Sequence, residues 1–297
     1  MTTKRKNPTG RVAYVDGRYL PHSAASVHIE DRGLQFADGV YEVFAVVEGR
    51  LLDEVGHFDR LERSLRELSI KMPMARSALK AVVHETLRRN RLSEGLVYLQ
   101  VTRGAHRRDH AFPKAERPTL IITARTLDWA AIEKRRAEGV TVALVPDIRW
   151  GRCDIKTTGL LPNAMAKTEA RKKSAYEAWL VDENGMITEG ASTNAWIVTK
   201  DNVLVTRDLK SNILAGVTRG AIMRALKEEG SNIRIEERAF SAAEAFAASE
   251  AFISSATGGV IPVVRVEKHV IGEGKPGPVT RRIHGLYREL SLSEARA

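Results

Sequence analysis

Strand-like and helix-like segments follow one another along this chain in two successive sets, and their order constrains the fold more than any other feature of the sequence. Runs of β-branched and aromatic residues bounded by turn residues indicate strands, and apolar residues three or four positions apart indicate helices. The first set has an expected strand–turn–strand at residues 12–20, expected strands at 40–47, 96–102 and 118–124, and expected helices at 57–69 and 77–89. Strand and helix do not alternate strictly, so we expect an α+β fold rather than a doubly wound parallel sheet.

The second set begins after a polar, helix-prone segment, residues 126–139. Its expected strands are at 140–146, 176–181, 193–199, 251–255 and 260–266, and its expected helices are at 160–173, 216–229 and 240–248. A chain of 297 residues can form about two domains of roughly 150 residues each. We therefore expect a small N-terminal α+β domain over residues 1–125, with residues 1–10 as a flexible arm. A linker would cover 126–139, and a C-terminal domain 140–297.

Composition excludes several classes of protein. Apolar residues make up 43% of the chain and charged residues 28%, which allows a buried core and is unlike disordered or fibrous proteins. Cys153 is the only cysteine, so a disulfide within the chain is impossible and a reducing compartment is favoured. No apolar run reaches the length of about 18 residues that a membrane span requires. We therefore expect a cytoplasmic protein without a membrane partner.

The charge balance is the one unusual bulk property, because 47 basic and 37 acidic side chains give a net charge of +10. Such an excess suggests nucleic acid, a membrane surface, or small phosphorylated or carboxylated ligands as partners. The basic clusters are scattered, are not interleaved with aromatic residues and accompany no nucleic-acid motif. Nucleic-acid binding is therefore a remote alternative. No His or Cys pattern has zinc spacing, and we expect no metal.

Lys156 lies between an expected strand and an expected helix, where functional residues often gather. A lysine in a partly buried place can lose its proton and act as an amine nucleophile. By position alone, a plain surface lysine is the more frequent case.

Two further motifs suggest a site. Glu189 precedes small residues that would let backbone approach a ligand closely, and Leu214–Arg219 precede a helix whose free N–H groups and dipole favour a phosphate. In isolation, the Glu189 motif is more simply explained as an ordinary turn. The Leu214–Arg219 motif is more simply explained as a helix N-terminus capped by its own threonine. Without a Walker lysine motif or Gly-x-Gly-x-x-Gly, nucleotide binding is not supported. An amine, an acid and a phosphate cradle are together what pyridoxal phosphate requires.

Several motifs, in this order, resemble those of the fold-type IV pyridoxal phosphate enzymes and, among these, the D-amino acid aminotransferases. They cover nearly the whole chain after the N-terminal arm, and they are Glu30–Val43, His57–Leu61, Val101–Gly104, Asp154–Lys156, Thr188–Gly190, Gly216–Arg219 and Ser254–Pro262. The resemblance implies two domains, a smaller N-terminal α/β sandwich and a larger C-terminal pseudo-barrel that binds pyridoxal phosphate.

The resemblance also implies roles for individual residues. Lys156 would be the Schiff-base lysine and the acid–base that moves the proton. Glu189 would pair with the pyridine nitrogen, and Arg60 would bind the phosphate. Further cofactor-binding positions would be Leu214, Val217, Thr218, Ser255 and Ala256. Because the family often has Thr where this chain has Ala256, only a backbone amide can serve at that position.

Arg108 and His110 resemble the carboxylate trap of the D-amino acid aminotransferases, with Tyr41 as its third member. An arginine binds a carboxylate bidentately, which suits this role. Because Arg107 is adjacent, the sequence leaves open whether Arg107 or Arg108 is the arginine of the trap. The alternative to a trap is a solvated basic loop. In the family this loop reaches the neighbouring subunit's site, which implies a homodimer with shared active sites.

The implied function is a ping-pong transamination of D-amino acids, such as D-alanine and D-glutamate, with 2-oxo acids such as 2-oxoglutarate. The alternatives within the same fold are a branched-chain L-amino acid aminotransferase, an R-selective amine transaminase and aminodeoxychorismate lyase. The Arg108-x-His110 pattern argues against the first two.

Overall fold

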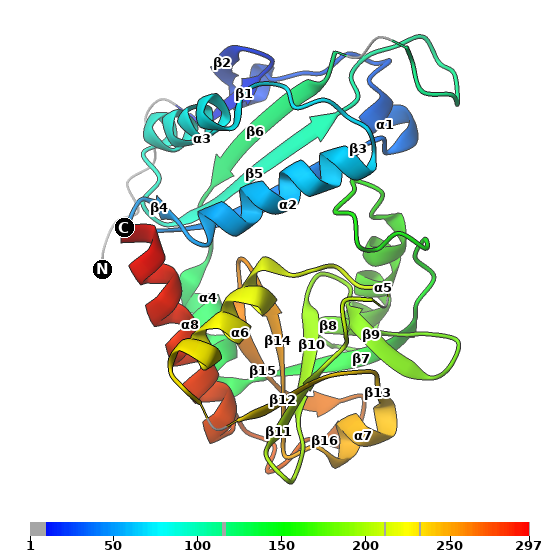
Figure 1. Ribbon diagram of the computed structural model, residues 1–297, viewed down its shortest axis with the longest axis vertical. Coiled ribbons are helices and arrows are strands. Elements are labelled where there is room, and N and C mark those ends of the chain that lie inside the picture. Colours follow the sequence, from blue (N-terminus) through cyan, green and yellow to red (C-terminus); the bar gives the residue numbers. More distant parts are fainter. Residues whose placement is uncertain (1–9, 115–116, 211, 232, 297) are drawn as a thin grey trace. The chain divides into compact units, whose positions relative to one another are not determined.

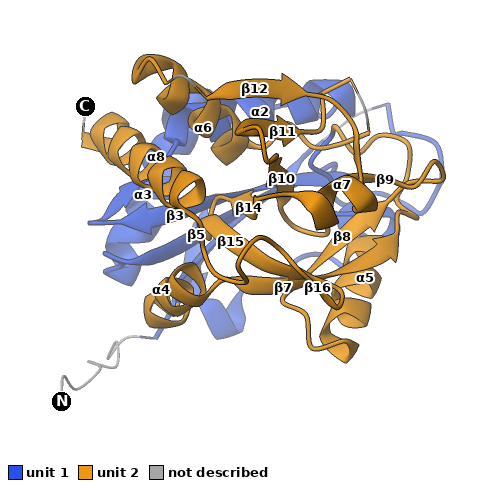
Figure 2. Cartoon of the chain, turned by 90° about the horizontal axis from the view of Figure 1, so that it is seen from below, with its two compact units in different colours: residues 1–127, 155–159 blue, residues 128–154, 160–297 orange. Residues whose placement is uncertain are grey.

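The computed structural model describes residues 10–114, 117–210, 212–231 and 233–296, and the chain divides into two compact units (Figures 1 and 2). Unit 1 comprises residues 1–127 and 155–159, and unit 2 comprises 128–154 and 160–297. The expected N-terminal arm lies, except for Gly10, outside the described residues.

Unit 1 is built on an antiparallel sheet of six strands in the order β2-β1-β6-β5-β3-β4. Its strands are β1 (Val12–Val15), β2 (Arg18–Pro21), β3 (Gly39–Val47), β4 (Arg50–Leu51), β5 (Gly95–Thr102) and β6 (Thr119–Arg125). Its helices are η1 (His22–Ala24), α1 (Arg32–Phe36), α2 (Glu54–Glu67) and α3 (Arg76–Asn90).

Helices α2 and α3 contribute to one core together with the sheet of unit 1. Apolar residues at helical spacing on α2, such as Phe58, Leu61 and Leu65, are buried together with Phe44 of β3 and Leu99 of β5. Because side chains alternate between the two faces of a strand, every second strand residue can enter this core. The result is the α/β sandwich that the sequence predicts for this half of the chain.

Unit 2 contains a ten-stranded sheet in the order β12-β11-β10-β14-β15-β7-β8-β9-β13, with β16 paired to β15 (Figure 1). Its strands are β7 (Val140–Pro146), β8 (Glu177–Val181), β9 (Met186–Gly190), β10 (Asn194–Val198), β11 (Val203–Thr206), β12 (Arg234–Glu237), β13 (Phe240–Ser241), β14 (Glu250–Ser255), β15 (Gly259–Val266) and β16 (His269–Val270). Its helices are α4 (Trp129–Glu138), α5 (Leu161–Lys172), α6 (Val217–Glu228), α7 (Ala242–Ala247) and α8 (Pro278–Arg296).

Strand β10 is buried on both faces of this sheet. Ala195 and Ile197 belong to one hydrophobic cluster, whereas Trp196 and Val198 belong to another, in which the Trp196 ring stacks on Phe252 at a centroid distance of 5.3 Å. The second cluster also contains residues of α6 and α8. Unit 2 therefore mixes parallel and antiparallel strands within one large helix-covered sheet, and the α+β class is confirmed.

The boundaries of the two compact units differ from those of the predicted domains in two places. The expected linker contains α4, whose Arg136 donates to the Gly258 carbonyl oxygen at 2.7 Å and so holds this segment to unit 2. Residues 155–159 belong to unit 1, because Ile155 is buried in its core.

The sequence analysis did not anticipate helix α8. The Glu250 carboxylate of β14 accepts hydrogen bonds from the backbone N–H groups of Val279 and Thr280, at 2.9 and 2.8 Å. A carboxylate at a helix N-terminus satisfies orphan donors and complements the helix dipole. Within the described ranges, no helix is both long and apolar enough to cross a membrane.

Candidate active site

Lys156 is held against the first strand residues of β3 by its own backbone. Its carbonyl oxygen accepts a hydrogen bond from the Tyr41 N–H at 3.0 Å, and the Thr158 N–H donates to the Gly39 carbonyl oxygen at 3.0 Å. The half-buried Lys156 side chain places Nζ 3.4 Å from the Tyr41 hydroxyl and 4.4 Å from the centre of its ring. The structure therefore brings together two of the residues that the sequence analysis selected.

Tyr98 of β5 supports Tyr41 from the neighbouring strand. The two rings stack with centroids 5.6 Å apart, and the Tyr98 hydroxyl donates to Gln100 Oε1 at 2.6 Å. Burial, together with the nearby Tyr41, raises the pKa of Tyr98 to about 12, so its phenol stays neutral at physiological pH. Tyr98 was not predicted from the sequence. It lies two residues before Gln100, which pairs with Tyr41 in the sheet, and this strand register is seen only in the structure.

Arg60 lies on α2, and Glu42 of β3 orients its guanidinium group. Arg60 Nε and Nη2 donate to the two Glu42 oxygens at 2.7 and 2.8 Å, and His57 Nδ1 lies 2.7 Å from Glu42 Oε2. Glu42 is fully buried, and burial alone would raise the pKa of its carboxyl. Arg60 and His57 outweigh that effect and lower this pKa to about 2. The guanidinium group is thereby held in one orientation, as a fixed anion site would require.

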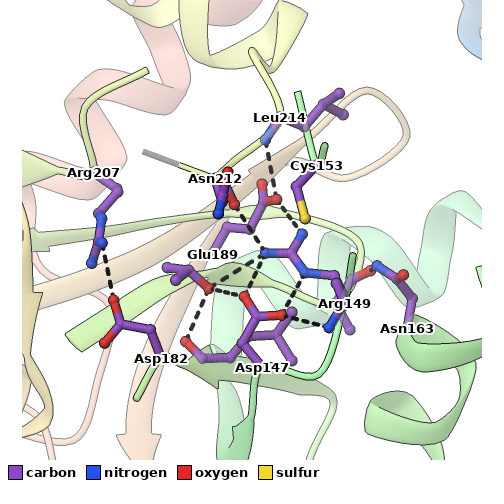
Figure 3. A network of polar contacts seen from close by, with 12 residues as sticks. Asp147, Arg149, Cys153, Asn163, Asp182, Glu189, Arg207, Asn212 and Leu214 are labelled. Atoms are coloured by element: carbon purple, nitrogen blue, oxygen red, sulfur yellow. Dashed lines mark hydrogen bonds and ion pairs between the residues drawn. The ribbon is translucent and has the colours of Figure 1, made fainter. Parts of the chain in front are cut away.

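Glu189 is the last residue but one of β9 and is buried in unit 2. Its Oε1 accepts hydrogen bonds from Arg149 Nη1 at 2.5 Å and from the Leu214 N–H at 3.1 Å (Figure 3). Its Oε2 accepts one from Asn194 Nδ2 at 3.0 Å. The carboxylate therefore has a fixed orientation, and Leu214, another predicted site residue, contacts it directly.

Arg149, which the sequence analysis missed, is the cation that pairs with Glu189. It also binds Asp147 through Nη2 at 2.7 Å, and the Thr188 hydroxyl donates to the same Asp147 oxygen at 2.8 Å (Figure 3). Burial alone would lower the pKa of Arg149, but Asp147 and Glu189 raise it above its ordinary value. Arg149 thus stays charged beside Glu189.

The first turn of α6 has the features of an anion site. Gly216, the residue before the helix, provides no side-chain cap, and the hydroxyl oxygen of Thr218 is buried without a hydrogen-bond partner among the described residues. A Cβ on Gly216 would lie only 1.9 Å from Asn194 Oδ1, so any other residue at this position would displace the Asn194 side chain. A buried hydroxyl without a partner, beside free N–H groups at a helix start, fits a phosphate oxygen.

Ser255 is the last residue of β14, and Ala256 begins the turn that follows. Ser255 Oγ accepts a hydrogen bond from the Gly258 N–H at 3.2 Å, and Arg136 of α4 holds the Gly258 carbonyl oxygen. The turn is therefore stabilised by its own hydrogen bond and by those from Arg136 of α4.

Arg108 and His110 are exposed on a loop of unit 1, and Arg107 beside them is exposed as well. The Arg108 guanidinium lies 4.7 Å from the centre of the Phe36 ring, and the His110 ring lies 5.4 Å from the same ring. Phe36 thus groups Arg108 with His110, two of the three residues of the predicted carboxylate trap.

A family model described as "Amino-transferase class IV" matches residues 39–266. The chain belongs to this family of aminotransferases. It is an enzyme that depends on pyridoxal phosphate, and the buried Glu189 carboxylate and the Thr218 hydroxyl suit that cofactor. The expected fold-type IV architecture and the expected cofactor are both confirmed.

The relatives that this chain resembles include D-alanine aminotransferases. The enzyme of Bacillus licheniformis is 39% identical over 279 residues, which cover 94% of this chain and 96% of the relative. The enzyme of Staphylococcus haemolyticus is 36% identical, over 91% of this chain and 94% of the relative. Among solved structures, the branched-chain amino acid aminotransferase of Escherichia coli has a TM-score of 0.88 and 24% identity, over 96% of each chain, and this likeness concerns the fold alone.

The buried ion pairs of Glu42 predict a pH-dependent stability. Glu42→Gln is expected to lower the free energy of unfolding by about 3 kcal/mol at neutral pH, because a pKa of about 2 in place of 4.5 corresponds to about 1.4 kcal/mol per unit. A carboxyl whose pKa is lowered on folding adds stability above its unfolded pKa and loses it as the pH falls through the folded value. The difference between wild type and variant should therefore shrink between about pH 4.5 and pH 2.

Urea unfolding of both proteins at a series of pH values measures this difference. A difference that is the same at neutral pH and near pH 3 would contradict the assignment. Glu54→Gln is a suitable control, because Glu54 also pairs with basic residues but is partly exposed.

Proposed function

We propose that this enzyme transfers the amino group between D-amino acids and 2-oxo acids, with D-alanine and D-glutamate as donors and 2-oxoglutarate as an acceptor. D-alanine aminotransferases that are 34–39% identical over more than nine-tenths of the chain support this substrate class. The observation that carries the chemistry is the Lys156 amine, which backbone hydrogen bonds hold beside the Tyr41 hydroxyl.

Pyridoxal phosphate, when bound, supplies an electron sink for the carbon that carries the amino group. Lys156 would hold the cofactor, and its Nζ would accept the proton from the substrate Cα and return it. The Tyr41 hydroxyl, 3.4 Å away, would hold that amine in place. Glu189, fixed by Arg149 and Asn194, would bind the pyridine N–H.

The phosphate would be bound by the first turn of α6, through the backbone of Val217 and the hydroxyl of Thr218, and by Arg60 and the Ser255–Ala256 turn. Arg108 and His110 would bind the substrate carboxylate, with Tyr41 as the third member of this trap. Because Arg108 and His110 are exposed on their loop, they can enter the site of a second copy. We therefore propose a homodimer with shared active sites, located in the cytoplasm, where the single thiol of Cys153 stays reduced.

Donor preference and the visible spectrum test the proposed reaction. With 2-oxoglutarate as acceptor, we expect D-alanine to be converted much faster than L-leucine or R-phenylethylamine. Wild-type protein should have the yellow absorbance of lysine-bound cofactor, which D-alanine shifts to shorter wavelength. Lys156→Ala should lack that band, because it lacks the amine. Faster conversion of L-leucine would contradict the substrate class, and an unchanged band in Lys156→Ala would contradict the role of Lys156.

Thr218→Val tests the phosphate cradle. The variant should raise the dissociation constant of pyridoxal phosphate about tenfold or more, which is the cost of losing a hydrogen bond to a charged group. The stability of the cofactor-free protein should change by less than about 0.5 kcal/mol, because the hydroxyl has no partner to lose among the described residues.

Thr280→Val is the matched control for this variant. Thr280 also has a buried hydroxyl without a described partner, in the first turn of a helix, α8. Equilibrium dialysis or absorbance titration measures the affinity of each variant. Equal cofactor affinities of Thr218→Val and Thr280→Val would contradict the assignment of Thr218 to the phosphate.

Hybrid dimers test whether the carboxylate trap acts on the partner's site. A dimer of one Lys156→Ala subunit and one Arg108→Ala subunit combines an intact Lys156 with an intact Arg108 only across subunits. If the trap acts across the interface, this hybrid should recover about half of the wild-type activity. A wild-type subunit paired with a Lys156→Ala/Arg108→Ala subunit should then be impaired. The opposite pattern would show that each trap serves its own subunit.

A further inference from the structure

Two sequence motifs of unit 1 contain buried arginines to which the proposed reaction assigns no role. Arg32 lies in the Glu30–Val43 motif and Arg103 in the Val101–Gly104 motif, and both are almost completely buried. Both donate to the same oxygen of Asp38, from Arg32 Nε at 2.7 Å and from Arg103 Nε at 2.8 Å. Two buried cations thus share one carboxylate, which is costly unless their other N–H groups find acceptors.

The other N–H groups of these arginines bind backbone carbonyl oxygens in different places. Arg103 binds those of Leu68 and Ser69, at 2.7 and 3.1 Å, after the end of α2. Arg32 binds those of Asp109 and His110, at 2.5 and 3.4 Å. Arg32 is therefore the arginine that holds the loop on which Arg108 and His110 lie.

Aromatic contacts add a second attachment of the same loop. The Phe36 ring has the Arg32 guanidinium at 4.7 Å, the Arg108 guanidinium at 4.7 Å and the His110 ring at 5.4 Å from its centre. Phe112 is attached in a similar way, because the Arg103 guanidinium lies 3.8 Å from the centre of its ring. Cation–π contacts of this kind orient a guanidinium group as well as binding it.

The start of the loop is fixed by backbone hydrogen bonds. The Arg32 N–H donates to the Gly104 carbonyl oxygen at 2.9 Å, and the His106 N–H donates to the Glu30 carbonyl oxygen at 3.2 Å. Gly104 has a φ of +92°, and a Cβ there would lie 2.0 Å from the Arg117 carbonyl oxygen, so the chain can leave β5 in this direction only with glycine. The loop is thus held at its start by backbone, and at Asp109 and His110 by Arg32.

We infer that Arg32, braced by Asp38, is a positioning residue for recognition of the substrate carboxylate. It holds the Asp109 and His110 carbonyl oxygens, and the Phe36 ring orients the Arg108 and His110 side chains that contact it. This inference rests on the proposed function of Arg108 and His110. Lysine cannot replace Arg32 here, because an ammonium group lacks the planar fork that binds Asp38 and two carbonyl oxygens at once.

Steady-state kinetics of the Arg32→Lys holoenzyme test this inference. The KM values for D-alanine and 2-oxoglutarate should each rise about tenfold, as expected when a charge-assisted contact is lost. The kcat value, the absorbance of lysine-bound cofactor and the dissociation constant of pyridoxal phosphate should stay within about twofold, since Arg32 does not touch that chemistry. A purely structural role would instead lower kcat, cofactor affinity and thermal stability together. That result, or unchanged KM values, would overturn the inference.

Arg207→Lys is the matched control. Arg207 is largely buried in unit 2 and, like Arg32, binds both a carboxylate, Asp182, and a backbone carbonyl oxygen, that of Ile187. Its KM values should equal those of wild type. If Arg32→Lys does not fold, Phe36→Leu replaces it, because Phe36 is only partly buried. Unchanged KM values in Phe36→Leu would then overturn the inference.

Arg108→Ala in the same assay separates the two possible failures. If wild type does not convert D-alanine, or if Arg108→Ala has the KM values of wild type, the proposed function fails. If wild type and Arg108→Ala behave as expected but Arg32→Lys behaves like wild type, only the positioning role of Arg32 fails.

Discussion

The pairing of residues 156–158 with the start of β3 is the contact on which the proposed chemistry of this protein depends. Its two backbone hydrogen bonds, from Tyr41 and to Gly39, do not involve the Lys156 side chain, so they fix the position of the backbone while the amine donates only to the Tyr41 hydroxyl among the described residues. Burial of Ile155 in the core of unit 1 anchors the same segment. A reactive lysine can therefore be held firmly in position and still be available for chemistry.

At several other places in the chain, buried arginine–carboxylate pairs fix the position of a charged side chain. Glu42 orients Arg60, Asp38 orients Arg32 and Arg103, and Arg149 orients Glu189. A guanidinium binds in a fixed plane, so each pair restricts the direction of a charged group as well as its charge. Some of the basic side chains of this chain are thus buried inside the protein, in ion pairs that position residues of the predicted site.

Much of the candidate site could be predicted from the sequence, because its chemistry depends on residue type and on local spacing. Thr218 lies two residues after a glycine, in the first turn of a helix, and Lys156 lies between a strand and a helix. Both signals are short-range. Glu42, Arg149 and Arg32 could not be assigned in this way. Each has a partner in another element of the fold: Glu42 binds Arg60, Arg149 binds Glu189, and Arg32 binds the Asp109 and His110 carbonyl oxygens. Arg149 and Glu189, for example, meet because β7 and β9 both flank β8.

By itself, the sequence determined the α+β class, through its periodicity, and the cofactor, through motifs that resemble those of the fold-type IV enzymes, because periodicity and local motifs are properties of neighbouring residues. Tertiary structure decided which carboxylate pairs with which arginine, where the loop of Arg108 and His110 is held, and that Glu250 caps α8. Those contacts depend on strand order and on desolvation. A buried charge must find a partner wherever the fold places one, and sequence spacing does not specify that place.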